Sequence, residues 1–350
     1  MLTSIYVLKK NLREIGDYIV GIEAYNRLIS YNIKKKKLSD SEKAILDFKN
    51  YNSNLNKKLF DYKTIIISLY GALEYFIEGL IKEYLDYLCQ VVKEYKDLPQ
   101  KIQDNHFELS ADLIKNLKLQ KYQNILSKES IIINLNSCIN GSNYKLNTEA
   151  YTYHSSNFRH DSINDFFSKV GIEGISNKTK EVQSFEQYLV QQFPGIPISQ
   201  IPDTKVFEKI TDLANRRNEI SHGNQSEILS NMILIEYICF IENYCDALNQ
   251  IIFELILPFE IEDKAIPLMP INIFNNRIIC VNLKNKSIKV NDMLIAKTND
   301  TKHKYLYGKI KQLQVNNVSV DSIDSQQSID VGIETDFNIK QNQEFYYISQ

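Results

Sequence analysis

The residues best suited to chemistry lie in one short stretch, RRNEISHGN at positions 216–224. Arg217 stands five residues before His222, and Gly223 predicts the end of a helix. A permanently charged arginine can fork onto phosphate oxygens, and a histidine can move protons near neutral pH. The pair could therefore help RNA to cleave itself through its own 2′-hydroxyl, a reaction that strictly needs no metal.

The spacing of Arg217 and His222 decides where each must lie. On a continuous helix, five residues turn by about 140°, so the two side chains would diverge. Because Gly223 and Asn224 stop the helix, we expect Arg217 in its last turn and His222 in the bend beyond. Asn224 and Glu227 resemble a capping box that opens the next helix just beyond His222, where free N–H groups would favour a phosphate.

A simpler interpretation of this stretch stays open. An arginine and a histidine at this spacing are a common pattern by themselves. Arg217 and Asn218 could form a plain surface helix end, with His222 merely interacting with its C-terminus.

Four other residues are candidates for contacting a substrate. Arg216 precedes Arg217 and could bind the same ligand. Glu74 lies within an apolar helix face, where a carboxylate needs a partner. It is either salt-bridged to a nearby lysine or a polar partner of the Arg217 guanidinium. Arg159 and His160 precede a capped helix, and they either contact RNA phosphate or are plain surface residues.

Helical periodicity runs through most of residues 1–260. The longest predicted helix covers residues 55–95 and is followed by Pro99. Ser162 and Asp165 resemble a capping pair that opens a helix closed by Gly171, and Asp203 is expected to cap the helix that leads into residue 216. Other helices are predicted over residues 3–30, 111–126, 129–139, 184–193 and 225–255, the last ended by Pro258. The lysine run 34–37 indicates a solvated loop.

Beyond Asp263 the sequence changes to short β-rich runs separated by Asn, Asp, Ser and Lys turns. The runs are IICVNL, KSIKV, DMLIAKT, KYLYGKIKQLQV, VSVDSI, DVGIETDF and EFYYI. Such runs at close spacing predict a small antiparallel β-barrel. We therefore expect a mainly α fold class, with a helical domain at residues 1–262, a barrel at residues 265–350, and a boundary near Glu262–Pro267.

Composition excludes several classes of function. The formal net charge of −2 argues against a purely electrostatic nucleic-acid binder. The histidines do not cluster with cysteines or carboxylates at metal-ligand spacing, and no glycine-rich phosphate loop is present, so we expect no metal and no cofactor. The five cysteines form no C-x-x-C pair, which indicates buried free thiols in a reducing cytoplasm.

Two segments bear on localisation. The N-terminal sequence MLTSIYVLKKNLREIGDY has no apolar run long enough for a signal peptide. Charged and polar residues interrupt the apolar segment 232–257, which predicts an amphipathic helix and not a membrane span. A cytoplasmic protein without a membrane partner is expected.

The motif RNEISHG in a long helical region resembles the HEPN superfamily, whose motif is arginine, a polar residue, three to five further residues and histidine. The wider chain, over about residues 40–255, resembles the RiboL-PSP-HEPN branch or the neighbouring MAE-type HEPN-like nucleases. The supporting stretches are SLYGALEYFIEGLIKEY at Ser68–Tyr84 and SNFRHDSINDFFSKVGI at Ser156–Ile172.

This resemblance implies a metal-independent endoribonuclease that acts as a homodimer through its helical domain. Arg217 and His222 would be catalytic, with Asn218 supporting them. Related proteins recur in toxin–antitoxin, abortive-infection and CRISPR systems, so an antitoxin or defence protein is an expected partner. The alternative is a non-catalytic HEPN-type protein that binds RNA or protein, as an antitoxin or a translation-factor-like adaptor would.

The predicted barrel resembles the second domain of translation elongation factors. The resemblance rests on KIKQLQVNNVSVDSI and SIDVGIETDF. The chain lacks a GTPase domain, so GTP hydrolysis does not carry over. The barrel could dock tRNA or ribosome-associated RNA, or serve as a protein-interaction module.

Overall fold

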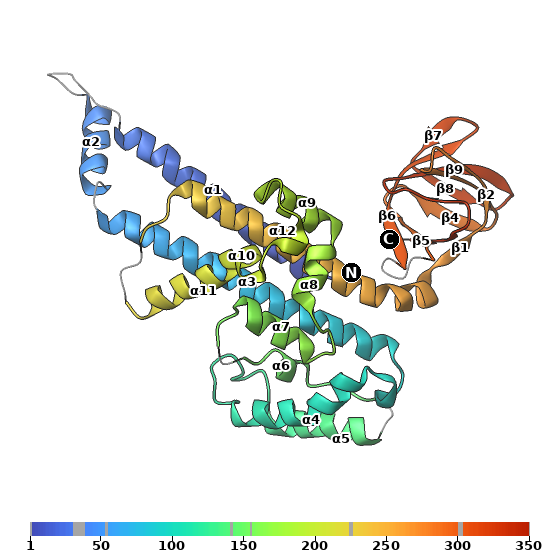
Figure 1. The fold of residues 1–350 in the computed structure, drawn as a ribbon, viewed down its shortest axis with the longest axis horizontal. Helices are drawn as coiled ribbons and strands as arrows, with labels where there is room; N and C mark the ends of the chain where they lie inside the picture. The colour runs from blue at the N-terminus through green and yellow to red at the C-terminus, as the bar shows by residue number, and fades with distance from the viewer. Residues whose placement is uncertain are drawn as a thin grey trace. The chain divides into compact units, whose positions relative to one another are not determined.

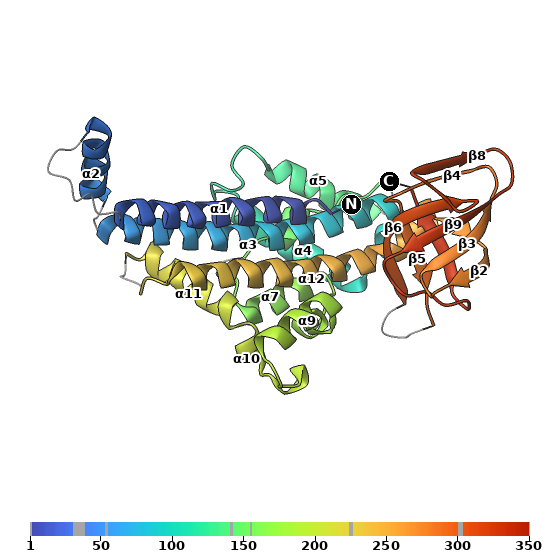
Figure 2. The same cartoon turned by 90° about the horizontal axis from the view of Figure 1, so that it is seen from above.

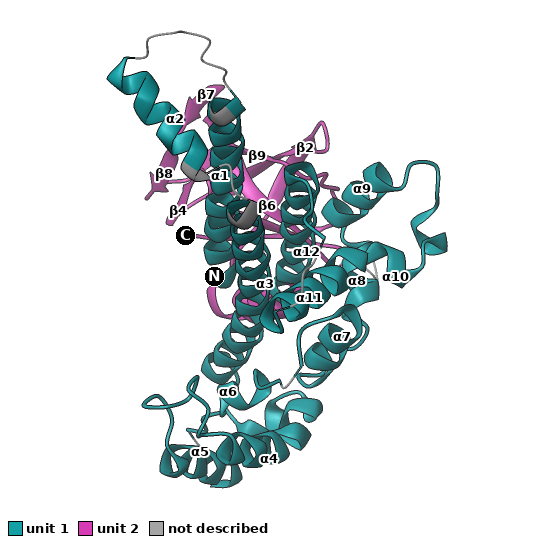
Figure 3. Ribbon diagram, turned by 90° about the vertical axis from the view of Figure 1, so that its left-hand side faces the viewer, with its two compact units in different colours: residues 1–253 teal, residues 254–350 magenta. Residues whose placement is uncertain are grey.

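The computed structural model describes residues 2–30, 39–52, 55–140, 143–154, 156–223, 227–299 and 304–349. The chain divides into two compact units, residues 1–253 and residues 254–350, which Figure 3 colours separately. The first unit is helical, and the second holds the end of the last helix and the strands β1 to β10. The fold class is therefore as predicted, mainly α with a C-terminal antiparallel barrel.

Three long helices run side by side in the helical unit: α1 (Ser4–Ser30), α3 (Leu55–Val91) and the first part of α12 (Asn231–Lys264) (Figures 1 and 2). Glu83 of α3 accepts hydrogen bonds from the backbone N–H groups of Thr3 (3.0 Å) and Ser4 (2.9 Å). A carboxylate thus caps the N-terminus of α1 and joins it to α3. The predicted apolar face of α3 is buried at Ile66, Leu69, Leu73, Phe76, Ile77, Leu80 and Leu88, and partly buried at Leu59.

Shorter helices complete the helical unit. They are α2 (Asp40–Asn52), α4 (Gln100–Lys115), α5 (Lys128–Asn140), α6 (Thr148–Tyr151), α7 (His160–Ser168), α8 (Ile175–Glu181), α9 (Gln183–Gln192), α10 (Asp203–Val206) and α11 (Glu208–Ser221), with 3₁₀ turns η1 (Tyr95–Asp97) and η2 (Ile198–Gln200). Helix α11 packs against α3, which places the stretch 216–223 beside the longest helix of the unit.

The predicted helix over residues 111–126 is wrong. The chain is helical over residues 100–115 instead and forms turns over 116–125. Pro99 is the N-cap of α4. A proline is tolerated at a helix start because the first N–H groups have no partner within the helix. Pro99 therefore opens α4 as well as following α3, which ends at Val91 and not near residue 95.

Two predicted caps are also wrong. Helix α7 begins at His160 with Arg159 as its N-cap, and the Ser162 hydroxyl accepts the Arg159 N–H (2.7 Å) from within the first turn. Asp203 is the first residue of α10 and Pro202 is its N-cap. Phe207 then separates α10 from α11.

The last helix differs from its prediction at both ends. It begins at Asn231, and Glu227 lies in a non-helical segment, so Glu227 does not cap a helix beside His222. Asn224 and the lysine run 34–37 lie outside the described residues. Helix α12 also continues through Pro258, although a proline inside a helix removes a hydrogen bond at a cost of about 3 kcal/mol. Burial of the neighbouring Ile256 and Leu257, worth about 1.5–3 kcal/mol each, offsets that cost.

Helix α3 is long and apolar enough, over Lys57–Val91, to cross a membrane by length and composition. Of its most apolar window, 56% is buried inside the structure, as in the core helix of a globular unit. The five cysteines are free, as predicted, but only Cys138 and Cys245 are buried, and Cys239 is exposed. The prediction that all five are buried is therefore wrong.

The second unit is an antiparallel, nearly closed barrel. Its strands are β1 (Ile266–Leu268), β2 (Pro270–Phe274), β3 (Ile278–Leu283), β4 (Lys286–Lys289), β5 (Met293–Lys297), β6 (Tyr305–Val315), β7 (Val318–Val320), β8 (Ser322–Ser325), β9 (Ile329–Thr335) and β10 (Glu344–Ile348). They pair in the order β1-β10-β5-β6-β9-β3-β2, with β7 on β6 and β4 on β8. Each predicted β run forms strands, while β1 and β2 were not predicted.

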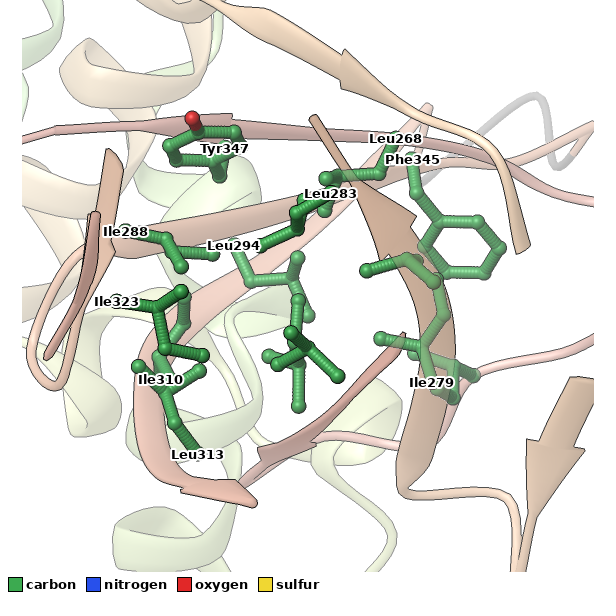
Figure 4. Packing of buried hydrophobic residues seen from close by; sticks show 14 of the residues in the cluster. Leu268, Ile279, Leu283, Ile288, Leu294, Ile310, Leu313, Ile323, Phe345 and Tyr347 are labelled. Carbon is green, nitrogen blue, oxygen red and sulfur yellow. The ribbon is translucent and has the colours of Figure 1, made fainter. Parts of the chain in front are cut away.

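Alternating side chains of these strands fill the barrel. Leu283, Leu294, Ile310, Leu313 and Phe345 are among the fully buried members of this core (Figure 4). Between β6 and β7, Asn316 and Asn317 form a two-residue turn with φ of 48° and 65°. Positive φ at both positions matches the right-handed twist of the flanking strands.

Candidate active site at the end of helix α11

Helix α11 ends as its sequence predicts. Arg217 lies about one turn before the end, and His222 is the C-cap residue (φ −88°, ψ 3°). The His222 N–H donates to the Asn218 carbonyl (3.0 Å), and Gly223 has a φ of 77°, in the left-handed region that stops a helix. The His222 side chain is exposed and makes no hydrogen bond to another residue that the structure describes.

The Arg217 guanidinium is held from three sides. Its Nη1 donates to Asn157 Oδ1 (3.3 Å) and, more weakly, to Asn218 Oδ1 (3.5 Å). The guanidinium carbon lies 5.4 Å from the centre of the Tyr70 ring, in a cation–π contact. Within the described part of the chain, Nε and Nη2 donate to no other residue. These donors are therefore open to a ligand while the group keeps a fixed orientation.

Asn157 is the residue that joins the parts of this site. Its Nδ2 donates to Asn218 Oδ1 and to the Ala214 carbonyl (3.5 Å), while its Oδ1 accepts from Arg217. A single amide thus links the segment before α7 to the face of α11. Neither Asn157 nor Tyr70 was predicted as a site residue, although both lie in the stretches SNFRH and SLYGALEYF that carry the family resemblance.

Glu74 reaches Arg217 only through Tyr70. The Tyr70 hydroxyl donates to Glu74 Oε1 (3.2 Å) and accepts the Phe158 N–H (2.9 Å). Burial, with the Glu74 charge next in importance, raises the pKa of Tyr70, so the hydroxyl stays protonated and keeps this orientation. Glu74 also faces His154 Nε2 (3.7 Å), and no lysine partner is found among the described residues.

A second carboxylate continues this network. Glu78 accepts from His154 Nε2 (2.9 Å) and from Lys121 Nζ (2.7 Å). Burial alone would raise the pKa of Glu78, but the hydrogen bonds from His154 and Lys121 outweigh it and lower the pKa overall. The ionised carboxylate anchors the chain segment that leads to Asn157.

Arg159 is held against α11 through Asn215. Its Nη2 and Nε both donate to Asn215 Oδ1 (3.0 and 3.3 Å). Asn215 and Asn218 are three residues apart and therefore share one face of the helix. The structure thus places Arg159 beside the face of α11 that carries Asn218, the second partner of Arg217.

Arg216 and His160 lie elsewhere. Arg216 is ion-paired with Asp212 and donates to the Tyr62 hydroxyl (2.9 Å). Burial would lower the pKa of Arg216, but these hydrogen bonds outweigh it and raise the pKa. His160 stacks on Phe207, with ring centroids 4.5 Å apart, and faces Asp161 and Asp203. Both side chains are engaged within the helical unit.

Among the described residues, no group of three or more His, Cys, Asp or Glu side chains could hold a metal ion. The functional groups that gather at the end of α11 are guanidinium, amide and imidazole. Arginine and asparagine amides hold anions more readily than cations.

A family model described as RiboL-PSP-HEPN matches residues 30–254. The chain belongs to the RiboL-PSP-HEPN family. The match covers α11, the helix α3 beside it, and α7. No curated protein is similar enough to the chain to count as a match.

The HEPN motif residues are therefore brought to one exposed helix end. Arg217 and Asn218 share the amide of Asn157, Glu74 lies behind them through Tyr70, and Arg159 lies beside them through Asn215. His222 follows at the C-cap. Chemically, this set can bind an oxyanion through the open guanidinium donors and can move a proton through the imidazole.

Proposed function

We propose that this HEPN protein is a metal-independent endoribonuclease. The 2′-oxygen of the RNA attacks the neighbouring phosphorus, and the bond from phosphorus to the 5′-oxygen breaks. The 2′-hydroxyl loses a proton and the leaving 5′-oxygen gains one, so the products carry a 2′,3′-cyclic phosphate and a 5′-hydroxyl. His222 would assist these proton transfers, and Arg217 would stabilise the charge that develops on the phosphate.

One observation carries the proposal: Arg217 and His222 lie at the same exposed end of α11, and Arg217 is held in place while Nε and Nη2 stay open. A fixed donor aimed at developing charge is worth more than a mobile one, because it does not have to reorganise during the reaction. Asn218 supports the site by accepting the Asn157 amide.

We further propose that the site is completed in a homodimer formed by the helices flanking residues 210–230. One Arg217–His222 pair offers a single imidazole for two proton transfers. Two motifs that face each other in a dimer would form one composite cleft with two imidazoles. Light scattering at micromolar concentration should give a dimer for active protein. A strict monomer with full activity would contradict this part of the proposal.

The test of catalysis uses single-stranded RNA and two variants, Arg217→Ala and His222→Ala. Loss of acid–base help should lower the rate by about 10²–10⁴-fold, and loss of charge stabilisation by about 10²–10³-fold. Both positions are outside the core, so circular dichroism should show an unchanged fold. Arg13→Ala, an exposed arginine on α1, serves as the matched control.

Three features of the wild-type reaction should accompany this result. Cleavage should persist in EDTA, its products should carry 2′,3′-cyclic phosphates, and DNA should resist because it lacks the 2′-hydroxyl. Wild-type cleavage by His222→Ala would refute the mechanism. RNA binding without cleavage would instead support a non-catalytic HEPN-type binding protein.

The biological setting that we propose is toxin–antitoxin or anti-phage defence, with tRNA or ribosome-associated RNA as the target and an antitoxin or defence protein as a partner. Family membership supports this setting, since related proteins recur in such systems. Induced expression should arrest bacterial growth, and His222→Ala should relieve the arrest. Arrest by the variant equal to that by the wild type would contradict it.

A further inference from the structure

Arg217 and Arg159 are both held by neutral side chains. Asn157 and Asn218 accept from Arg217, and Asn215 accepts from Arg159. Among the described residues, neither guanidinium forms an ion pair with a carboxylate. An amide fixes the direction of a guanidinium as a carboxylate does, but it leaves the positive charge uncompensated.

Arg216 is the internal contrast. It precedes Arg217 in α11, yet its guanidinium is ion-paired with Asp212. A carboxylate partner neutralises the guanidinium charge, as expected for an arginine with a structural role. The amide partners of Arg217 and Arg159 leave the positive charge available to an anionic ligand.

The residues of α11 that hold the two guanidiniums are also neighbours. Asn215 and Asn218 lie on one helix face, three residues and about 4.5 Å apart along the helix axis. Asn157 and Arg159 are two residues apart in the segment that crosses this face, where Arg159 is extended (φ −114°, ψ 171°). Two arginines held at neighbouring positions of one helix face can each bind one of two neighbouring phosphates of a single strand.

We propose that Arg159 binds the phosphate next to the one that is cleaved, so that the site takes two successive phosphates of one unpaired RNA strand. The inference rests on the proposed function, because it takes Arg217 as the ligand of the cleaved phosphate. An unpaired strand is the form in which the backbone can lie along a helix face and in which a 2′-hydroxyl can align for attack. Asn215 acts as a positioning residue that holds the Arg159 fork toward the strand.

The test is the salt dependence of binding to single-stranded RNA in which every 2′-hydroxyl is methylated. Such a strand cannot be cleaved, so the measurement does not depend on whether the protein is a nuclease. Each phosphate contact contributes about 0.7 to the slope of log K against log salt for a single strand. Arg159→Gln should lower that slope by about 0.7, which makes the wild type lose about 2.6-fold more affinity than the variant between 50 and 200 mM salt.

Two matched variants separate a phosphate contact from a structural role. Arg13→Gln removes an equal charge from α1 and should leave the slope unchanged. Arg159→Lys keeps the charge without the fork, so it should keep the slope while binding more weakly. An unchanged slope in Arg159→Gln, or an equal loss in Arg13→Gln, would overturn the proposal.

A second measurement on wild-type protein covers the case in which Arg159→Gln does not fold. The methylated dinucleotide has one phosphate, and the trinucleotide has two. The slope should rise by about 0.7 from the first to the second. Equal slopes would also overturn a two-phosphate site. If the slopes behave as expected but RNA is never cleaved, then the nuclease assignment fails while the binding site stands.

Discussion

Acidification should destabilise the helical unit through His106, a fully buried residue of α4. Its Nε2 accepts the backbone N–H of Asn147 (3.0 Å), so the neutral ring must carry its proton on Nδ1. Nδ1 has no partner among the described residues, and the ring stacks on Tyr151. Burial lowers the pKa of His106 from 6.5 to about 4.

The sign of the effect follows from proton uptake. Between pH 6.5 and pH 4 the unfolded chain binds a proton at His106 and the folded chain does not, so stability falls as pH falls. Above pH 6.5 His106 is neutral in both states and stability is not reduced through it. Below pH 4 no further stability is lost through His106. Lowering the pKa from 6.5 to about 4, at about 1.36 kcal/mol for each unit of pKa, makes the free energy of unfolding fall by about 3 kcal/mol across this window.

Urea denaturation of wild type and His106→Gln at steps between pH 4 and pH 7 measures this loss of stability. Other groups titrate in the same window, so the quantity of interest is the difference between the two proteins. The variant should lose less stability than the wild type on acidification, by about 3 kcal/mol. Ser110→Ala, in the same hydrogen-bonded cluster, lacks a titratable group and should change stability equally at every pH. A wild-type pH dependence in His106→Gln would refute the reasoning.

Further predictions concern the site, two glycines and the barrel. Asn157→Ala should lower the rate of RNA cleavage by about 10²-fold with little change in KM, because Arg217 loses its orientation; single-turnover kinetics measure this. Gly71→Ala should raise the free energy of unfolding by about 0.5–1 kcal/mol, since an added Cβ meets nothing within 4 Å in the middle of α3. Gly308→Ala should lower it by about 1–3 kcal/mol in the barrel, where a Cβ would collide with Asp336; the same denaturation assay compares both glycine variants. A chain ending at Asp263 should keep the melting transition of the helical unit and its basal cleavage while losing substrate preference, as calorimetry and RNA assays can show.

The secondary-structure elements were predictable where one periodic pattern repeats many times. The apolar face of α3 recurs over ten turns, and the burial of Leu69, Leu73, Phe76 and Leu80 confirms it. The β runs beyond Asp263 were predicted for the same reason, since alternation and turn residues repeat seven times. Single prolines predicted the ends of helices less well. Pro99 opens a helix, and Pro258 lies inside one.

The candidate site was predictable only in part. The break after His222 follows from Gly223, which is local in sequence. The contacts of Asn157 with Arg217 and Asn218 join residues about 60 positions apart, and no spacing rule encodes them. His160 illustrates the converse: its type and position suggested a ligand contact, but packing against Phe207 turns it inward.

The paired asparagines of the barrel have a consequence for how the chain folds. At Asn316 and Asn317, both residues adopt positive φ, a conformation for which glycine is the usual choice. Asparagine tolerates this region and has fewer accessible backbone states than glycine when the chain is unfolded. The hairpin between β6 and β7 therefore loses less conformational entropy when it forms than it would with two glycines. The turn thereby favours the register in which Val315 pairs with Val318 and Leu313 with Val320.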